Sequence, residues 1–159
     1  MLEDGFAVEA SGWKGDNGTA IASGAETRQF YTGIARWAAS RGWLRLAFLR
    51  LDGHPIAFQY GLEDGGTYYF LKGGYDAKYS RFSPGRLLLA SLIERAFDNG
   101  LKRFDFGGAD ESFKREWANG RRELVHLQVF PPSVPGLIEW AAFAYGRPFV
   151  KRVGSLIRR

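Results

Sequence analysis

Two glycine-containing turns divide the middle of the chain into three strand-length segments. Asp52-Gly53 is a residue pair typical of a two-residue hairpin, and Asp64-Gly65-Gly66 marks a second turn. The segments 44–51, 56–62 and 67–72 around these turns carry apolar runs of strand length. Strands joined by such short connections run antiparallel. The sequence therefore predicts a three-stranded antiparallel meander.

A helix pattern follows the meander, over residues 84–99. Ser83 is a good N-cap residue, Pro84 suits the first helical position, and Gly100 follows the end. A further short strand contains Phe104 and Phe106, so a strand–helix–strand crossover lies at the centre of the chain. Open α/β sheets bind ligands where such a crossover helix begins.

The flanking segments complete the predicted fold class, a mixed α/β fold with a mostly antiparallel sheet, a central crossover and flanking helices. Phe30, Ile34, Trp37 and Ala38 share one face of a helix before the meander. A short helix over 111–117 and a last strand over 123–130 follow the crossover. We expect a core over 27–131, an N-terminal extension over 1–26 that could be the joint to a missing half, and a basic helical tail over 132–159.

Composition excludes several classes of site and location. The chain has no cysteine and two histidines, so we expect no disulfide, no thiolate chemistry and no metal. It has no Walker loop and no dinucleotide fingerprint. No segment approaches the ~20 apolar residues of a membrane span. The acidic start lacks a secretory signal, which predicts a cytoplasmic protein.

The net charge of +5 is unevenly distributed. Residues 135–159 hold five basic side chains against one acid, so the rest of the chain is nearly neutral. A nearly neutral body argues against DNA as a partner, and mildly against tRNA. The basic tail, with its aromatic residues, could make weak contact with a membrane surface or dock onto a protein domain.

Ser83-Pro84-Gly85-Arg86 is a candidate phosphate site. A helix N-terminus offers N–H groups and the positive end of a dipole, and Gly85 leaves room for an anion. Arg86 adds a positive charge, and Arg81 stands just upstream. Ordinary helix capping is the alternative explanation, because Ser-Pro starts many helices.

Acidic and basic side chains also gather after the crossover. Asp105 ends a strand beside Gly107-Gly108, and Glu111 follows closely, so either carboxylate could act as a general base or serve in capping. Lys114 could bind an anionic substrate group or lie in solvent. Trp13, beside Lys14, must either pack on the domain or bind a ligand.

An ordered series of short motifs resembles the acetyltransferase domain of CelD/BcsL-type proteins of cellulose and exopolysaccharide biosynthesis. These proteins belong to the GNAT superfamily and are similar to Fem-type aminoacyltransferases. The motifs run along nearly the whole chain: Ser11-Gly12-Trp13-Lys14-Gly15, Gly18-Thr19-Ala20-Ile21, Asp52-Gly53-His54-Pro55-Ile56-Ala57, Lys72-Gly73-Gly74-Tyr75-Asp76, Ser83-Pro84-Gly85, Asp105-Phe106-Gly107-Gly108 and Phe113-Lys114-Arg115-Glu116-Trp117.

The resemblance implies direct attack of an amine or sugar hydroxyl on the thioester of acetyl-CoA. A backbone N–H near Gly73-Gly74 would then bind the carbonyl oxygen, and Tyr75 or Tyr79 would protonate the leaving thiolate. Arg81, Ser83, Gly85 and Arg86 would bind the cofactor, whereas Lys114, Trp13 and Lys14 would bind the acceptor. The residues implied as base are Asp105 and Glu111.

The resemblance leaves three functions open. The first is an acyl-CoA-dependent N-acetyltransferase acting on a small-molecule or sugar-linked acceptor. The second is a Fem-like transferase that takes an aminoacyl group from tRNA. The third is a non-catalytic half-domain that binds a partner or a nucleotide sugar. Family members are longer, so we also expect a second GNAT-like half or a homodimer.

Overall fold

A computed structural model describes residues 1–12, 18–108, 111–123, 125 and 127–146 of the chain. Internal contacts divide the chain into two compact units, Met1–Trp117 and Ala118–Arg159. The observed boundary falls 14 residues before the end of the predicted core at 131, and residues 1–26 belong to the first unit. Residues 1–26 belong to the first unit because the helix near the N-terminus packs on the sheet.

The first unit is built on a four-stranded sheet in the order β1-β2-β3-β4. β1 pairs with β2 and β2 with β3 in antiparallel fashion, whereas β3 and β4 are parallel. These pairings confirm the predicted meander and central crossover. The strands are β1 (Leu44–Leu51), β2 (His54–Asp64), β3 (Thr67–Tyr75) and β4 (Arg103–Asp105).

The first hairpin has the turn chemistry that its sequence predicts. Asp52 and Gly53 have φ values of 50° and 82°. Positive φ at both central residues is the requirement of a type I′ turn, whose twist matches that of the flanking strands. Because the turn fixes how the strands meet, it also sets the register in which Leu51 pairs with His54.

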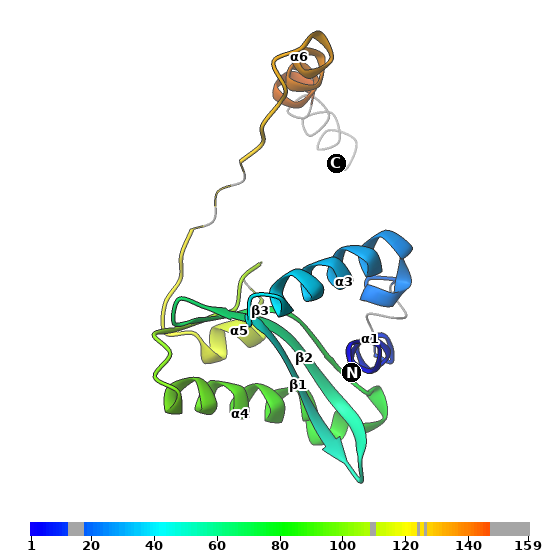
Figure 1. Cartoon of the computed structure of the whole chain (residues 1–159), viewed down its shortest axis with the longest axis vertical. Helices are drawn as coiled ribbons and strands as arrows, with labels where there is room; N and C mark the ends of the chain where they lie inside the picture. The colour runs from blue at the N-terminus through cyan, green and yellow to red at the C-terminus, as the bar shows by residue number, and fades with distance from the viewer. Residues whose placement is uncertain (13–17, 109–110, 124, 126, 147–159) are drawn as a thin grey trace, which may run out of the picture. The chain divides into compact units, whose positions relative to one another are not determined.

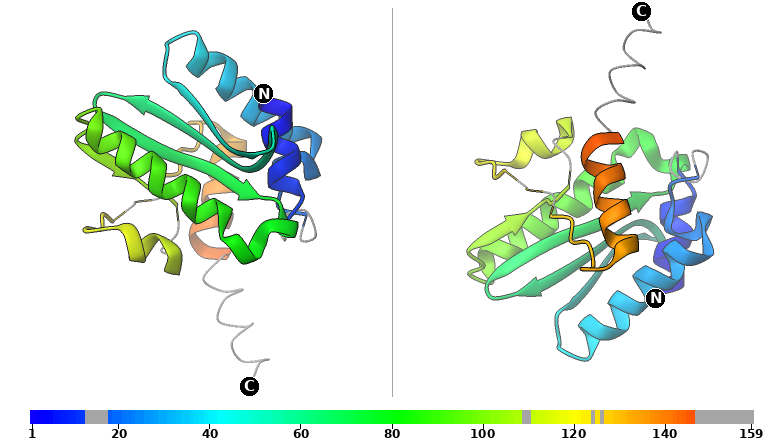
Figure 2. Two further views of the ribbon diagram at one scale, coloured as in Figure 1. Left: turned by 90° about the horizontal axis from the view of Figure 1, so that it is seen from below. Right: turned by 90° about the horizontal axis from the view of Figure 1, so that it is seen from above.

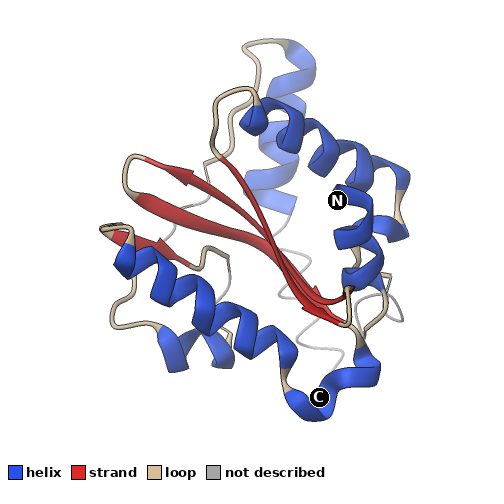
Figure 3. Cartoon of the chain, turned by 60° about the horizontal axis from the view of Figure 1, so that its bottom comes forward, coloured by secondary structure: helices blue, strands red, loops and turns tan. Residues whose placement is uncertain are grey.

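Helices cover both faces of this sheet. Figures 1 and 3 show α1 and α3 on one face and the crossover helix α4 on the other, and Figure 2 shows α4 lying along the strands. The helices of this unit are α1 (Leu2–Ala10), η1 (Ile21–Ser23), α3 (Ala25–Ala39), η2 (Ala77–Phe82), α4 (Pro84–Asp98) and α5 (Ser112–Trp117).

Strand β2 is the centre of the core and is buried on both faces. Phe58 and Tyr60 belong to a cluster with Phe6 of α1, Ile21 of η1 and Ala35 of α3. Ala57 and Gln59 alternate with them and are also buried. A strand covered by helices on both sides must be apolar along nearly its whole length, which explains the continuous apolar run Ile56-Ala57-Phe58.

Two segments differ from the sequence prediction. Helix α1 occupies residues for which no helix was predicted; the helix is short, and Gly5 lowers its intrinsic propensity. The predicted strand over 123–130 is wrong for the residues described there, which lie in no strand. Val125, Leu127 and Val129 alternate as a strand would, yet their side chains are exposed. Alternation alone does not form a strand without a pairing edge.

The described part of the second unit contains a helix, α6 (Val134–Ala141), followed by a π-helical turn (Ala142–Gly146). Ser133 caps α6 by accepting a hydrogen bond from the Gly136 N–H, at 3.3 Å. Phe130 packs against Phe143, with 5.8 Å between their ring centroids. In the residues that the structure describes, no helix is long and apolar enough to cross a membrane.

Replacing Gly74 with alanine should loosen the packing of α1 on β3. A Cβ at position 74 would lie 2.7 Å from the Glu9 Cα, a backbone atom that moves only with its helix. We expect Gly74→Ala to lower the free energy of unfolding by about 1–3 kcal/mol in urea titrations. Gly33→Ala is the control, because no atom lies within 4 Å of a Cβ there, and it should stabilise by about 0.5–1 kcal/mol. Equal effects would contradict this packing.

Candidate functional site

The end of β3 is the point at which the sheet opens. β3 pairs with β4 only from Thr67 to Tyr69, and β4 ends at Asp105. β3 continues to Tyr75, and the chain then passes through η2 into α4. The two parallel strands therefore separate after Tyr69, four residues before Gly73. Gly73, Gly74 and Tyr75, the residues predicted to act on the thioester, lie on β3 beyond this opening.

The structure brings Tyr75 and the start of α4 together. A Cβ at Gly85 would lie 3.0 Å from the Tyr75 ring, so glycine is the residue that lets the helix start approach β3. Asp76 caps η2 between them by accepting a hydrogen bond from the Lys78 N–H, at 3.0 Å. The predicted cofactor residue Gly85 and the predicted proton donor Tyr75 are thus neighbours across one short connection.

Ser83 stands at the N-cap of α4, but the predicted cap by its side chain is wrong. Its side chain accepts no hydrogen bond from the helix. Its backbone instead adopts the left-handed conformation, with φ 50° and ψ 49°, and its carbonyl oxygen accepts from Arg86 and Leu87. This conformation is rare for residues other than glycine.

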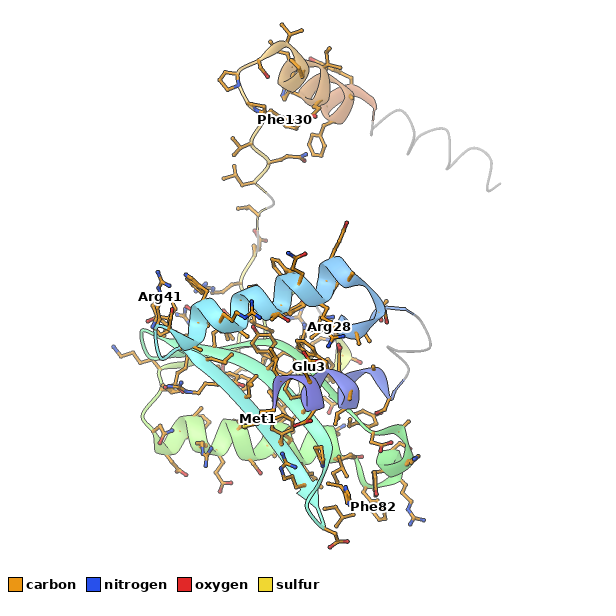
Figure 4. The ribbon with its side chains drawn as sticks, turned by 45° about the vertical axis from the view of Figure 1, so that its right-hand side comes forward. Met1, Glu3, Arg28, Arg41, Phe82 and Phe130 are labelled. Atoms are coloured by element: carbon orange, nitrogen blue, oxygen red, sulfur yellow. The ribbon has the colours of Figure 1, made fainter. Side chains whose placement is uncertain are left out.

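The positive charges near this helix start are exposed. Arg86 forms an ion pair with Glu116 of α5, with 2.5 Å between the charged atoms. The Arg81 guanidinium lies 4.5 Å from the centroid of the Phe82 ring; Figure 4 labels Phe82 beside the start of α4. An exposed ion pair contributes little to stability. Arg86 can therefore exchange Glu116 for a phosphate at low cost.

Asp105, Glu111 and Lys114 form one connected cluster around the glycine turn after β4. The Asp105 carboxylate accepts a hydrogen bond from the Gly107 N–H at 2.8 Å, and the Lys114 ammonium donates to the Gly107 carbonyl at 3.0 Å. Lys114 also pairs with Glu111 at 2.9 Å, and its side chain is only 13% exposed. Gly107 and Gly108 have positive φ, which lets the chain fold back over Asp105. The three predicted site residues therefore lie together.

Aromatic packing holds this cluster beside β3. Tyr68 stacks on Phe104 with 4.7 Å between ring centroids, and Phe104 contacts Phe106 at 5.0 Å. Phe70 of β3 lies 6.4 Å from Phe113 of α5. Because Phe113 precedes Lys114, this packing fixes the position of the lysine. Burial raises the pKa of Tyr68, with a smaller contribution from Glu63, so its hydroxyl stays neutral.

Glu9 is a buried carboxylate that the sequence did not single out. It lies on α1, is 1% exposed, and accepts a hydrogen bond from the Ile21 N–H at 2.7 Å. The Lys72 ammonium of β3 is 3.7 Å from its other oxygen and 5.7 Å from the centroid of the Tyr31 ring. Burial raises the pKa of Tyr31, and the Glu9 charge adds to this. The spacing of Leu2, Phe6 and Glu9 would have placed the carboxylate on an apolar helix face.

Tyr60 connects this group to the core. Its hydroxyl donates to the Tyr31 carbonyl oxygen at 3.1 Å. Burial raises the pKa of Tyr60 to about 12, with a further contribution from Tyr31. The two tyrosines therefore remain protonated at neutral pH.

Some predicted residues cannot be placed. Trp13 and Lys14, predicted to bind the acceptor, lie outside the described residues, as do residues 147–159 of the basic tail. Among the residues that are described, no group of three or more His, Cys, Asp or Glu side chains could hold a metal ion.

The sequence matches the acetyltransferase (GNAT) domain over residues 2–115. The chain belongs to this family. The match confirms the prediction of a GNAT-type acyltransferase domain, and it begins within α1, so the buried Glu9 is part of the GNAT domain. The assignment to the CelD/BcsL type remains a prediction.

A solved structure is also similar to this GNAT domain. It is the ribosomal-protein-S18-alanine N-acetyltransferase from Escherichia coli, at 19% sequence identity and a TM-score of 0.42. The similarity covers 52% of this chain and 56% of that one, so the chain spans about half the length of this structure. No curated protein matches the chain.

Substitutions at Ser83 test the unusual start of α4. Because the side chain makes no cap hydrogen bond, Ser83→Ala should change the free energy of unfolding by less than about 0.5 kcal/mol. Ser83→Gly should stabilise by about 1 kcal/mol, because glycine adopts positive φ without strain.

Urea unfolding measures both effects, and Asp76→Ala is the matched control. Asp76 does cap η2 with its side chain, so its replacement should cost about 1 kcal/mol. A similar loss in Ser83→Ala would mean that Ser83 acts as an ordinary cap.

Proposed function

We propose that the chain is an acyl-CoA-dependent N-acyltransferase that transfers an acetyl group to an amine. The observation that carries this proposal is the path of the chain at the end of β3. Within a GNAT domain, β3 leaves its parallel partner and leads directly to a helix start that contacts Tyr75 through Gly85. This arrangement offers a thioester site and an anion site on one continuous segment.

The start of α4 fits the phosphates of acetyl-CoA. Gly85 lies in the first turn of α4, where the helix dipole favours negative charge, and its missing side chain makes room for the Tyr75 ring. Arg81 and Arg86 are exposed beside it and supply positive charge. Pro84 is buried, which anchors the helix start to the domain. Gly73 and Gly74 stand upstream, where the acetyl group of the same molecule would lie.

Direct transfer requires a nucleophile, an oxyanion donor and two proton movements. The amine nitrogen would attack the thioester carbonyl carbon, and the carbon–sulfur bond would break as the amide forms. A backbone N–H near Gly73-Gly74 would bind the carbonyl oxygen. Asp105 or Glu111 would take the proton from the amine, and Tyr75 would give one to the thiolate. This assignment rests on the pairing of Asp105 with Tyr69 at the opening, and on Lys114, which joins Glu111 to the glycine turn after Asp105.

Glu9 and Lys72 would position the end of β3 rather than react. Their ion pair joins α1 to β3 two residues before Gly74, and the Glu9 backbone packs directly on Gly74. A displacement of this backbone by even a fraction of an ångström would misplace an oxyanion donor. The buried pair thus serves as a positioning device for the proposed N–H group.

The acceptor that we propose is an amine of a small molecule or sugar precursor. The resemblance of the motifs to CelD/BcsL-type proteins supports a role in exopolysaccharide biosynthesis in the cytoplasm. Lys114 would bind a negative group of this acceptor, with Trp13 and Lys14 contributing from the segment after α1. A second GNAT-like half or a second copy of the chain would complete the enzyme.

Calorimetry with acetyl-CoA tests the cofactor site. We expect binding to the intact chain, and about a tenfold weaker affinity in Arg86→Gln, because a charge-assisted contact to phosphate is lost. Arg95→Gln is the matched control, since Arg95 lies on the last turn of the same helix and is exposed. Absence of heat and of any thermal shift at millimolar acetyl-CoA would exclude CoA dependence.

Transfer assays test the catalytic assignments. Asp105→Asn and Glu111→Gln keep hydrogen-bonding atoms in place but remove the base, so the true base should lose about 10²–10⁴-fold in turnover with acetyl-CoA binding retained. Release of CoA can be followed with a thiol reagent over a panel of amino sugars and primary amines. Asp98→Asn, at the exposed end of α4, is the control. Full activity in both site variants would remove these residues from the mechanism.

A further inference from the structure

The outer face of α3 is apolar and uncovered. Phe30 is 60% exposed and Trp37 is 46% exposed, although both are large and belong to a regular helix. They line a shallow groove of about 490 Å³ together with Glu26, Gln29, Gly33 and Ile34. The inner face of the same helix is already occupied, because Ala35 and Ala38 are buried against the domain. The helix thus carries a second apolar face.

The residues of this face are arranged symmetrically about its centre, with aromatic residues at equal distances and opposite charges at equal distances. Gly33 and Ile34 stand at its centre, Phe30 and Trp37 lie at equal distances on either side, and Glu26 and Arg41 lie at equal distances beyond them. An antiparallel copy of the helix would set aromatic against aromatic and acid against base. A two-fold interface has this self-complementary property, because each contact occurs twice with the roles exchanged.

The charged ends of the face are available for such pairing. The Arg41 guanidinium lies 4.7 Å from the centroid of the Trp37 ring, so it is held at the end of the face; Figure 4 labels it at one end of α3. Glu26 is in the first turn. Neither side chain forms an ion pair within the described part of the chain, whereas the neighbouring Arg28 pairs with Glu3 of α1.

The centre of the face permits a close approach. Gly33 is exposed, and nothing lies within 4 Å of the position its Cβ would take. A residue without a side chain lets two helix backbones come near each other, and the neighbouring Ile34 packs partly against the core of its own unit. The 15 residues of α3 span about 22 Å, and Arg41 lies two residues beyond the end of the helix, so the aromatic and charged contacts are spread along the whole face.

We propose that this face of α3 binds the same face of a second copy of the chain, as an antiparallel two-fold dimer. Glu26 pairs with Arg41 of the other copy at both ends, and Phe30 packs on Trp37 between them. A contact of one helix per copy is at the small end of specific interfaces, so the dissociation constant is on the order of micromolar. The interface lies on α3, apart from β3 and the start of α4, so self-association and acetyl transfer are measured separately.

Charge reversal tests the dimer in the intact chain. Sedimentation equilibrium from about 1 to 200 μM should show a reversible monomer–dimer equilibrium. Glu26→Arg and Arg41→Glu should each weaken self-association by at least about tenfold, because like charges then meet at both ends. An equimolar mixture of the two variants should associate again, since every pair in the mixed dimer joins opposite charges.

Matched controls separate this interface from others. Glu94→Arg, an exposed reversal on α4, should leave self-association unchanged. Phe30→Ser should abolish dimerisation, whereas Phe97→Ser should not, although Phe97 is 77% exposed on α4. Circular dichroism checks that each variant is folded. A wild-type chain that stays monomeric at 200 μM would overturn the proposal, as would charge variants that associate normally or a mixture that fails to recover.

Discussion

The close approach of α1 to β3 is the contact on which the arrangement of the first unit depends. At Gly74 the strand has no side chain, and the helix backbone at Glu9 occupies the space that one would need. The same residue brings a carboxylate into the core, where it accepts the Ile21 N–H and lies near Lys72. A buried charge is tolerated only with such partners. The helix, the η1 turn and the end of β3 are therefore fixed relative to one another by a single side chain.

The parts of the fold that the sequence predicted well are those with local causes. The Asp52-Gly53 turn requires two positive φ values, and those residues tolerate them. The crossover helix was predicted from the change in the spacing of apolar residues and from Pro84 at its start. Helix α1 and the segment after Trp117 were predicted poorly because their structure depends on partners distant in sequence. A short helix gains little from propensity, and an alternating segment needs an edge to pair with.

In the candidate site, too, local features were predicted from the sequence and features that depend on distant contacts were not. Asp105, Glu111 and Lys114 were named from their closeness in sequence, and the glycine turn at 107–108 does join them. Glu9 was missed because its significance arises from Lys72 and Gly74, more than 60 positions away. Ser83 was named for a side-chain cap, whereas the structure uses its backbone conformation instead. Residue type predicts what a side chain can do, but long-range packing decides whether it does so.

The distance in sequence between Glu9 and its partners also has a consequence for the order of events during synthesis. A ribosome adds roughly 5–20 residues per second, so several seconds separate the appearance of α1 from that of β3. During this interval Phe6 and the Glu9 carboxylate have no sheet to cover them, and a helix of nine residues is marginal alone. Helix α1 is thus made before the strand that stabilises it, and its final docking must wait until Lys72 and Gly74 have been translated.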